Sequence, residues 1–289
     1  MSYTSLGYML FVACCLIFYY IFPKKHRWWV LLAASIGFYA IVCLKYISFV
    51  FVTAASTYAG GRILEAYANK HKAYIKSQKG VWSKEERDLY KAKVSRRKKW
   101  ITAAILLLNF GILGFLKYYN FFADALNVLL NPLGGGLPEI GLPLPLGISF
   151  YTFQSMGYII DIYREKFPAE RNFGKMLLFT SFFPQIVQGP ISFYSDLSGK
   201  LYEGHDISFS NIKQGVLLIT WGFFKKLVIA DRLVNTVLTI PAEYEKHSGT
   251  VILITALFYA VQLYADFSGG IDISRGVSQL FGIDLAENF

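Results

Sequence analysis

The chain has 289 residues, of which 54% are hydrophobic and only 17% carry a charge, and its mean hydropathy is +0.40. A soluble domain usually carries about 25% charged residues, so this composition argues against an ordinary soluble protein. Aromatic residues make up 17% of the chain, which suits membrane interfaces and apolar interiors. The composition therefore predicts an all-α, polytopic membrane protein, with one membrane domain over residues 1–289.

The net charge of +10 is concentrated in one segment. Twelve Lys and Arg residues fall within residues 70–99 and oppose Glu85, Glu86 and Asp88, which places +9 of the charge there. Such a block can bind nucleic acid. Because it lies between apolar segments, the positive-inside rule gives the better interpretation, a basic cytoplasmic loop over residues 62–99. We expect membrane lipid and no nucleic acid as its partner.

The first half of the chain alternates apolar runs with basic or turn-rich segments. Residues 6–22 form an apolar run with the basic residues after it, which predicts a retained span with its N-terminus outside. Residues 30–60 predict two spans joined by a tight turn near Lys45. A further span is expected at 100–116, a short amphipathic surface helix at 121–130, and a turn-rich external loop at 131–138.

Residues 142–164 contain the most informative pattern in the chain. Pro143 and Pro145 predict an extended approach, because proline fixes φ and lacks an N–H. Residues 144–163 then predict a helix of about 30 Å, the thickness of the bilayer hydrocarbon core. Its polar residues share one face, since they are spaced i, i+3, i+7 and i+10: Tyr151, Gln154, Tyr158 and Asp161. We expect this stripe to face a cavity or partners, or to bind neighbouring helices together.

The next apolar run, residues 179–191, is interrupted by Pro184, Gly189 and Pro190. Broken backbone at membrane depth is tolerated where protein or a wet cavity surrounds it. The pattern predicts a re-entrant or broken helix, with an ordinary kinked span as the alternative. A polar loop is expected at 195–211, a helix at 216–238 and an external segment at 241–249.

A second polar stripe lies in residues 251–267. Thr255, Tyr259, Gln262 and Asp266 are spaced i, i+4, i+7 and i+11, again on one helical face. Two inward stripes predict a shared polar interior. Residues 268–270, Ser-Gly-Gly, predict a helix break just after the second stripe.

Ionisable residues within apolar runs are the better functional candidates, because a charge in a span is costly. They are Asp161, Asp266, Asp272 and Lys225, and the sequence permits Lys225 or Lys226 to pair with Asp266 or Asp272. The histidines are less promising. His26, His71, His205 and His247 all fall in predicted loops, where each is expected to be a solvated surface residue. No soluble-enzyme motif occurs, and the three cysteines have no metal-ligand spacing, so no metal is expected.

Four blocks in order carry a family resemblance: LPLGISFYTFQSMGYIIDIYR, FFPQIVQGPI, GFFKKLVIADRL and QLYADFSGGIDISRGVSQLFGIDLAENF. Together they resemble the bacterial branch of the membrane-bound O-acyltransferase (MBOAT) family. This branch includes alginate O-acetylation proteins, peptidoglycan O-acetyltransferases and the D-alanyl transfer protein of teichoic acid. The resemblance covers almost the whole chain apart from the basic segment.

The resemblance implies a helical bundle around a central chamber. It implies transfer of an acyl group, acetyl by preference, from a cytoplasmic thioester donor to hydroxyls of an extracytoplasmic polysaccharide or cell-wall polymer. The donor, acetyl-CoA or an acyl carrier, acts as a substrate, with no tightly bound cofactor. A secreted or periplasmic acetylation partner and a bacterial plasma-membrane location are further implications. The family's histidines would follow residue 289, so we expect a chain truncated before them and assign no catalytic histidine.

Seven residues are then expected to line the path of the acyl group or acceptor: Gln154, Asp161, Gln185, Gln188, Tyr264, Asp266 and Asp272. Gly189, Gly269 and Gly270 would allow close approach of backbone. Two other functions fit the same patterns. Broken helices and inward carboxylates also mark transporters or flippases, and the basic segment suits a non-catalytic membrane scaffold.

Overall fold

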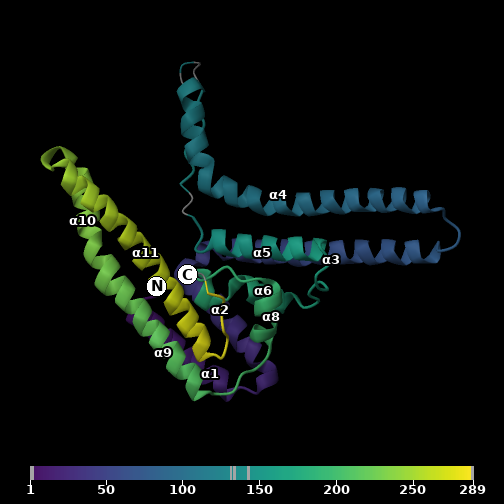
Figure 1. Cartoon of the computed structure of the whole chain (residues 1–289), viewed down its shortest axis with the longest axis horizontal. Coiled ribbons are helices and arrows are strands. Elements are labelled where there is room, and N and C mark those ends of the chain that lie inside the picture. Colours follow the sequence, from purple (N-terminus) through teal and green to yellow (C-terminus); the bar gives the residue numbers. More distant parts are fainter. Residues whose placement is uncertain (1–2, 131, 133–134, 142–143, 288–289) are drawn as a thin grey trace. The chain divides into compact units, whose positions relative to one another are not determined.

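The computed structural model describes residues 3–130, 132, 135–141 and 144–287, and every regular element in these ranges is a helix (Figure 1). Within these ranges three helical stretches are long and apolar enough to cross a membrane, and Leu6–Ile21 is a shorter apolar helix. The three are Lys24–Ser77, Lys84–Leu130 and Gly249–Leu280. The predicted fold class, a polytopic helical membrane protein, is confirmed. The chain divides into two compact units, which we describe one at a time; the single membrane domain stays a prediction.

One unit comprises residues 39–181 and 193–195. Its framework is a long antiparallel hairpin of α3 (Ile47–Ser77) and α4 (Lys84–Leu130) (Figure 1). Helix α5 (Ile148–Tyr163) packs along both members of the hairpin, and α6 (Phe173–Ser181) packs on α3. The predicted turn near Lys45 is confirmed, because a short 3₁₀ turn, Leu44–Tyr46, separates α2 (Arg27–Cys43) from α3.

The basic segment is helical where the sequence suggested a loop. It consists of the second half of α3 and the first third of α4, joined by a turn at residues 78–83. Ser83 caps α4, since its Oγ accepts from the Glu86 N–H and the Glu86 carboxylate accepts from the Ser83 N–H. A seam of aromatic contacts joins the two charged helices, involving Tyr67, His71, Tyr74, Trp82 and Tyr90. This apolar seam explains why so charged a segment folds.

Helix α5 begins later than predicted. Gly147, at φ 68°, precedes Ile148, so the helix has 16 residues where twenty were expected. A positive φ is readily adopted by glycine and ends the extended approach. Sixteen residues span about 24 Å, less than the roughly 30 Å of a bilayer core. Pro143 lies outside the described residues.

The other unit comprises the described residues of three stretches: 1–38, 182–192 and 196–289. It includes α1 (Leu6–Ile21), the first part of α2, α7 (Phe183–Ile186) and most of α8 (Tyr194–Tyr202). A long helical run follows: α9 (Phe209–Phe223), a π-helical segment (Phe224–Ala230) and α10 (Asp231–Ala242). Helix α11 (Gly249–Leu280) returns antiparallel to this run, as Figure 1 shows.

The predicted break at residues 268–270 is wrong, because α11 runs through it without interruption. Two pairs of glycines bring α9 and α11 into backbone contact. A Cβ on Gly222 would lie 2.6 Å from the Gly269 carbonyl oxygen, and a Cβ on Gly276 would lie 2.6 Å from that of Gly215. Small residues at such crossings are typical of packed membrane helices. Here glycine serves helix packing and not helix termination.

Two further predictions differ from the structure. The expected surface helix at 121–130 is the continuous end of α4, and the polar loop at 195–211 contains most of α8. Of the external loop at 131–138, residues 131, 133 and 134 lie outside the described ranges. Asn127 holds the chain at Leu137 with two hydrogen bonds, of 2.7 and 3.0 Å.

Candidate functional site

The predicted break in the 179–191 segment is confirmed. Helix α6 ends before the next short helix, α7, which spans four residues. The irregular backbone finds partners on N-terminal elements. The Phe183 N–H donates to Ser35 Oγ at 3.1 Å, and the Tyr3 hydroxyl donates to the Pro184 carbonyl at 2.6 Å. Tyr3 also accepts from the Gln188 N–H at 3.3 Å. These three backbone groups at the break are thus satisfied by protein, as a buried broken helix requires.

The two glutamines of this segment are held in place. Gln185 is buried and its amide nitrogen donates to Ser192 Oγ at 3.3 Å. A Cβ on Gly189 would lie 2.5 Å from Gln185 Cα, so the turn is too tight for a side chain there. The Gln188 side chain lies against α11, where its Oε1 is 2.2 Å from the position that a Cβ on Gly270 would take. The structure therefore places α7 and its following turn directly on α11.

Two lysine–aspartate pairs join the π-helical segment to α11. Lys225 Nζ lies 2.5 Å from Asp272 Oδ2, and these side chains are 12% and 13% exposed. Lys226 pairs with Asp266. Arg275 adds a longer contact of 3.9 Å to the other oxygen of Asp272. The pairing that the sequence permitted is confirmed, and we call these five residues the α11 charge cluster.

The π-helical segment helps to explain how two consecutive lysines reach the same helix. A π turn closes i→i+5 hydrogen bonds, so it widens the helix and shifts the direction of the side chains relative to an α-helix. Lys225 and Lys226 pair with carboxylates that are six residues apart on α11. Such turns occur often at functional sites.

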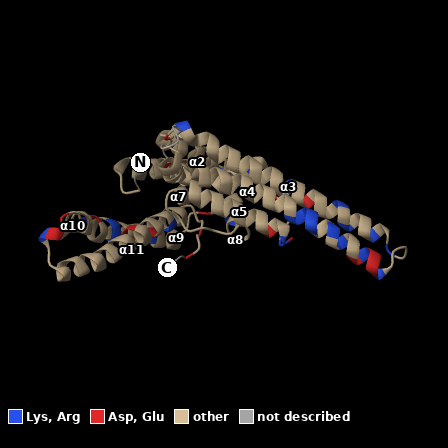
Figure 2. Ribbon diagram, turned by 90° about the horizontal axis from the view of Figure 1, so that it is seen from above, with Lys and Arg blue, Asp and Glu red and all other residues tan. Residues whose placement is uncertain are grey.

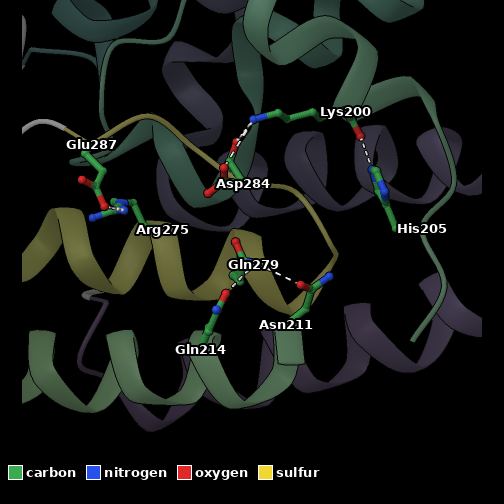
Figure 3. A network of polar contacts seen from close by, with 8 residues as sticks. All are labelled: Lys200, His205, Asn211, Gln214, Arg275, Gln279, Asp284 and Glu287. Carbon is green, nitrogen blue, oxygen red and sulfur yellow. Dashed lines mark hydrogen bonds and ion pairs between the residues drawn. The ribbon is translucent and has the colours of Figure 1, made fainter. Parts of the chain in front are cut away.

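The α11 charge cluster is electrically balanced when the C-terminal segment is included. Arg275 also pairs with Glu287 at 2.6 Å (Figure 3), so three cations face three carboxylates. Each aspartate is held by an ammonium group. The cluster therefore offers fixed charges that can orient a polar or charged substrate. Ser268 lies between the two aspartates in sequence, and its buried Oγ has no hydrogen-bond partner among the described residues.

The first polar stripe is buried in its own unit, as predicted. Tyr151, Gln154, Tyr158 and Asp161 are each less than 7% exposed. Gln154 donates to the Phe179 carbonyl at 3.2 Å, and Tyr158 accepts from the Glu170 N–H at 2.9 Å. Asp161 pairs with Lys166 at 2.7 Å. Three of the four polar groups thus bind neighbouring segments, the alternative role that the sequence allowed; their role in a substrate path stays a prediction.

The second polar stripe is less uniform. Thr255 is buried, but its hydroxyl donates within α11 to the Val251 carbonyl. Tyr259 is 53% exposed, and Tyr264, a path-lining candidate outside the stripe, is 56% exposed. As a whole, this stripe does not face the interior of the described chain. Its last residue, Asp266, does contact a largely buried group, because it pairs with Lys226 in the α11 charge cluster.

A polar network near the end of the chain was not foreseen. The ring Nε2 of His205 donates to the Lys200 carbonyl at 2.7 Å, and Lys200 Nζ donates to the Asp284 carbonyl at 2.8 Å (Figure 3). His205 was expected to be solvated, but it is half-buried against Gly282. Arg27, one of the basic residues after the first apolar run, is 8% exposed and donates to the His205 carbonyl. A single polar residue in a loop gives no pattern from which such a network could be predicted.

No group of histidine, cysteine, aspartate and glutamate within the described ranges is arranged to hold a metal ion. The three cysteines are unpaired thiols. Of the histidines, His71 shares a hydrogen bond of 2.6 Å with the Tyr90 hydroxyl in the aromatic seam. The geometry thus supplies helix packing, an ionic cluster and a broken helix, and it assigns no catalytic histidine.

This arrangement defines the chain as a helical membrane protein with glycine-packed helices and buried ion pairs. Comparison with known protein sequences identifies its relatives. It is 31% identical to a probable alginate O-acetylase of Azotobacter vinelandii over 97% of its length and 51% of that protein. It is 30% identical to a peptidoglycan O-acetyltransferase of Helicobacter pylori over 67% of its length and 41% of the relative. No family model matches the chain.

A third group of relatives extends the similarity. A teichoic acid D-alanyltransferase of Streptococcus thermophilus is 30% identical over 50% of this chain and 36% of that protein. The chain is thus a homologue of the alginate, peptidoglycan and teichoic acid branch of the membrane-bound O-acyltransferases, which confirms the resemblance. It spans about half the length of the alginate O-acetylases that it matches.

Proposed function

We propose that this chain forms part of a membrane O-acyltransferase. The enzyme transfers an acyl group, acetyl by preference, from a cytoplasmic thioester donor to hydroxyls of an extracytoplasmic polysaccharide or cell-wall polymer. The observation that carries the proposal is the similarity over 97% of the chain to alginate O-acetylases. The names of the other relatives support the same class of reaction, since each describes acyl transfer to a cell-envelope polymer.

The proposal includes a location and a direction. The protein crosses the bacterial plasma membrane several times, with its N-terminus outside and the basic hairpin of α3 and α4 in the cytoplasm. The charge distribution supports this orientation, because +9 of the net +10 lies in that hairpin. A secreted or periplasmic partner completes acetylation of the polymer, and acetyl-CoA or an acyl carrier supplies the acyl group.

In this proposal the substrate path is lined by Gln154, Asp161, Gln185, Gln188, Tyr264, Asp266 and Asp272, and Gly189, Gly269 and Gly270 permit close packing beside it. The α11 charge cluster supports such a role, because buried ionisable groups in membrane proteins are costly to retain. Its paired aspartates would orient the substrate. Proton transfer would fall to a base such as a histidine elsewhere in the enzyme.

The test uses the full reading frame, expressed in membrane vesicles. The vesicles receive acetyl-CoA or an acetylated carrier protein with labelled acetyl, together with alginate or peptidoglycan, and ester-bound label in the polymer is measured. We expect ester formation. Its absence in every donor and acceptor combination would exclude the acyltransferase, and polymer movement without ester would favour a transporter.

Variants at one ion pair test the residue roles separately. Asp266→Ala should abolish acyl transfer while the protein stays in the membrane, and Asp266→Leu with Lys226→Met should restore stability without restoring activity. Normal turnover in either variant would remove Asp266 from the substrate path. The exposed Asp231→Asn in α10 is a matched control and should leave turnover unchanged.

A further inference from the structure

The end of α5 contains a glutamate in an unusual backbone conformation. Glu165 has φ 59°, and no other non-glycine residue within the described ranges has a positive φ. The Glu165 N–H donates to the Ile162 carbonyl and the Lys166 N–H to the Asp161 carbonyl. These two bonds form a Schellman motif, whose left-handed position is usually a glycine. A non-glycine residue there costs about 1 kcal/mol, so the glutamate side chain must provide a compensating interaction.

That interaction is an ion pair with each helix of the basic hairpin. The Glu165 carboxylate pairs with Lys72 of α3, and its other oxygen lies 2.6 Å from Lys98 Nζ of α4. Hydrogen bonds from Lys72 and then from Lys98 hold the pKa of Glu165 below its usual range. One carboxylate therefore forms ion pairs with two ammonium groups, and it does so from a backbone position that favours glycine.

Lys98 is the more constrained of the two lysines. Its side chain is 10% exposed, whereas that of Lys72 is 62% exposed. An ammonium group buried to this extent needs a nearby anion, because its desolvation is costly. The Lys98 ammonium also lies 5.2 Å from the centre of the Tyr163 ring, which adds a favourable cation–π contact.

A cavity of about 270 Å³ opens beside this ion pair. Its polar lining comes from three elements: His71 and Lys72 of α3, Lys91, Ser95 and Lys98 of α4, and Tyr163 and Glu165 at the end of α5. Three ammonium groups line it against one carboxylate. Asp88 lies 3.7 Å from Lys91 but is itself 56% exposed, so it neutralises the cavity weakly.

We propose that this cavity is a phosphate-binding site and that the Glu165 carboxylate occupies it as an internal counterion until a phosphate displaces it. A phosphate group carries more oxygen acceptors than a carboxylate and can contact all three lysines. Ser95 and Tyr163 offer further hydroxyl donors. The Lys and Arg residues gathered on this part of α3 and α4 (Figure 2) would attract the anion to the site.

The phosphate has two possible sources with the same chemistry. Lys98 lies two residues before Trp100, where the apolar part of α4 begins. In the orientation proposed above, the site would therefore lie at the level of lipid headgroups on the cytoplasmic side. A phospholipid headgroup is one source. A soluble phosphate-bearing compound of the cytoplasm is the other. The proposal is independent of acyl transfer, because it is tested by binding.

The experiment uses the full reading frame in nanodiscs and has two arms. Pyrophosphate is titrated by calorimetry into nanodiscs of phosphatidylcholine, and retention of phosphatidylglycerol from mixed nanodiscs is measured by native mass spectrometry. In at least one arm, Lys98→Met should weaken binding about tenfold or more, the equivalent of one lost charged hydrogen bond. Glu165→Gln should strengthen binding in the same arm, because it removes the competing carboxylate. The arm that responds identifies the source.

A matched control separates the site from general attraction to a basic surface. Lys93→Met removes an exposed charge from the same helix outside the cavity, and it should change binding less than twofold. Equal effects of Lys93→Met and Lys98→Met would overturn the proposal, as would absence of binding in both arms. If Lys98→Met misfolded, Glu165→Gln would decide the test, because this variant is expected to bind the phosphate more tightly than wild type. If Glu165→Gln weakened binding or left it unchanged, the proposal would fail.

Discussion

Two antiparallel helix pairs in this chain are held together by different means. Helices α9 and α11 meet through glycines, with a Gly222 Cβ position 2.6 Å from the Gly269 carbonyl, and the π-helical segment that follows α9 forms ion pairs with α11. The charged end of α3, the charged start of α4 and the turn between them meet through an aromatic seam, with Trp82 and Tyr90 ring centres 5.0 Å apart, and carry excess positive charge. The first pair suits an apolar surrounding, where close backbone approach and neutral ion pairs are favourable.

The second pair suits water, where burying aromatic rings stabilises packing and unpaired lysines are well solvated. Because the two helix pairs are held together by different contacts, they should respond to different perturbations. Added volume and unpaired charge should damage α9 and α11, whereas loss of aromatic area should damage the tip of the hairpin.

The largest expected effect comes from breaking the Lys225–Asp272 pair. Asp272→Ala leaves Lys225, whose side chain is 12% exposed, without its closest partner. Removing one member of a buried pair costs about 3–5 kcal/mol, and we expect a corresponding loss of stability in thermal unfolding of the detergent-solubilised protein. Asp272→Leu with Lys225→Met should recover most of it. A single variant that unfolds at the wild-type temperature would show that the pair is solvated.

The next effect tests the glycine contact. Gly222→Val places carbon against the Gly269 carbonyl and against Ile273, at 2.6 and 2.7 Å from the first added atom. We expect a loss of about 3 kcal/mol, the upper part of the usual range for overpacking, because backbone is unable to yield. Unfolding in detergent measures it.

A matched control lies in α2 of the same unit. A Cβ on Gly37 would meet no atom within 4 Å, so Gly37→Ala should be neutral or stabilising by about 0.5–1 kcal/mol. On the hairpin side, Gly60→Ala meets the flexible end of the Ile105 side chain, at 2.8 Å, and should cost less than Gly222→Val. If all three variants unfolded alike, the α9–α11 contact would not depend on glycine.

A smaller and local effect is expected at the hairpin tip. Trp82→Ala removes a ring that contacts Tyr74 and Tyr90, at 5.5 and 5.0 Å between ring centres. We expect a loss of about 1–2 kcal/mol, seen as faster hydrogen exchange in residues 74–90 with α9 and α11 unchanged. Val81→Ala, at a side chain that is 75% exposed, is the control. Faster exchange throughout α11 would show that the two pairs are coupled.

The sequence predicted the features that depend on regular spacing. The burial of Tyr151 and Asp161 followed from a helical period, and the pairing of Lys225 and Lys226 with α11 followed from the cost of charges in apolar segments. It misjudged features that depend on a distant neighbour. The break expected at Gly269 and Gly270 does not occur, because α9 packs on one glycine and Gln188 lies against the other.

The basic segment was misjudged for a related reason. Its charge and length suggested a loop, and the aromatic residues that organise it are spread over both arms, with Tyr74 in one and Tyr90 in the other. Charge is visible locally, but a seam between two helices becomes apparent only when the helices are paired. Glu165 illustrates the same limit. It follows α5 in a Schellman motif, whereas its partners Lys72 and Lys98 lie on α3 and α4.

The smallest expected effect is the pH dependence of Glu165. Lys72 and Lys98 lower its pKa in the folded hairpin, so its contribution to stability is present above the ordinary glutamate value of about 4.3. That contribution is lost as the pH falls through the lower folded value, because the protonated carboxyl binds neither lysine. The unfolding temperatures of wild type and Glu165→Gln should therefore differ at pH 6 and converge towards pH 3. Glu139→Gln, which removes a carboxylate from the segment after α4 and leaves the Lys72 and Lys98 contacts intact, is the control measured in parallel. A constant difference between wild type and Glu165→Gln would mean that the carboxylate stabilises the hairpin through its shape and not its charge, and the excess positive charge would then have no role in holding α3, α4 and α5 together.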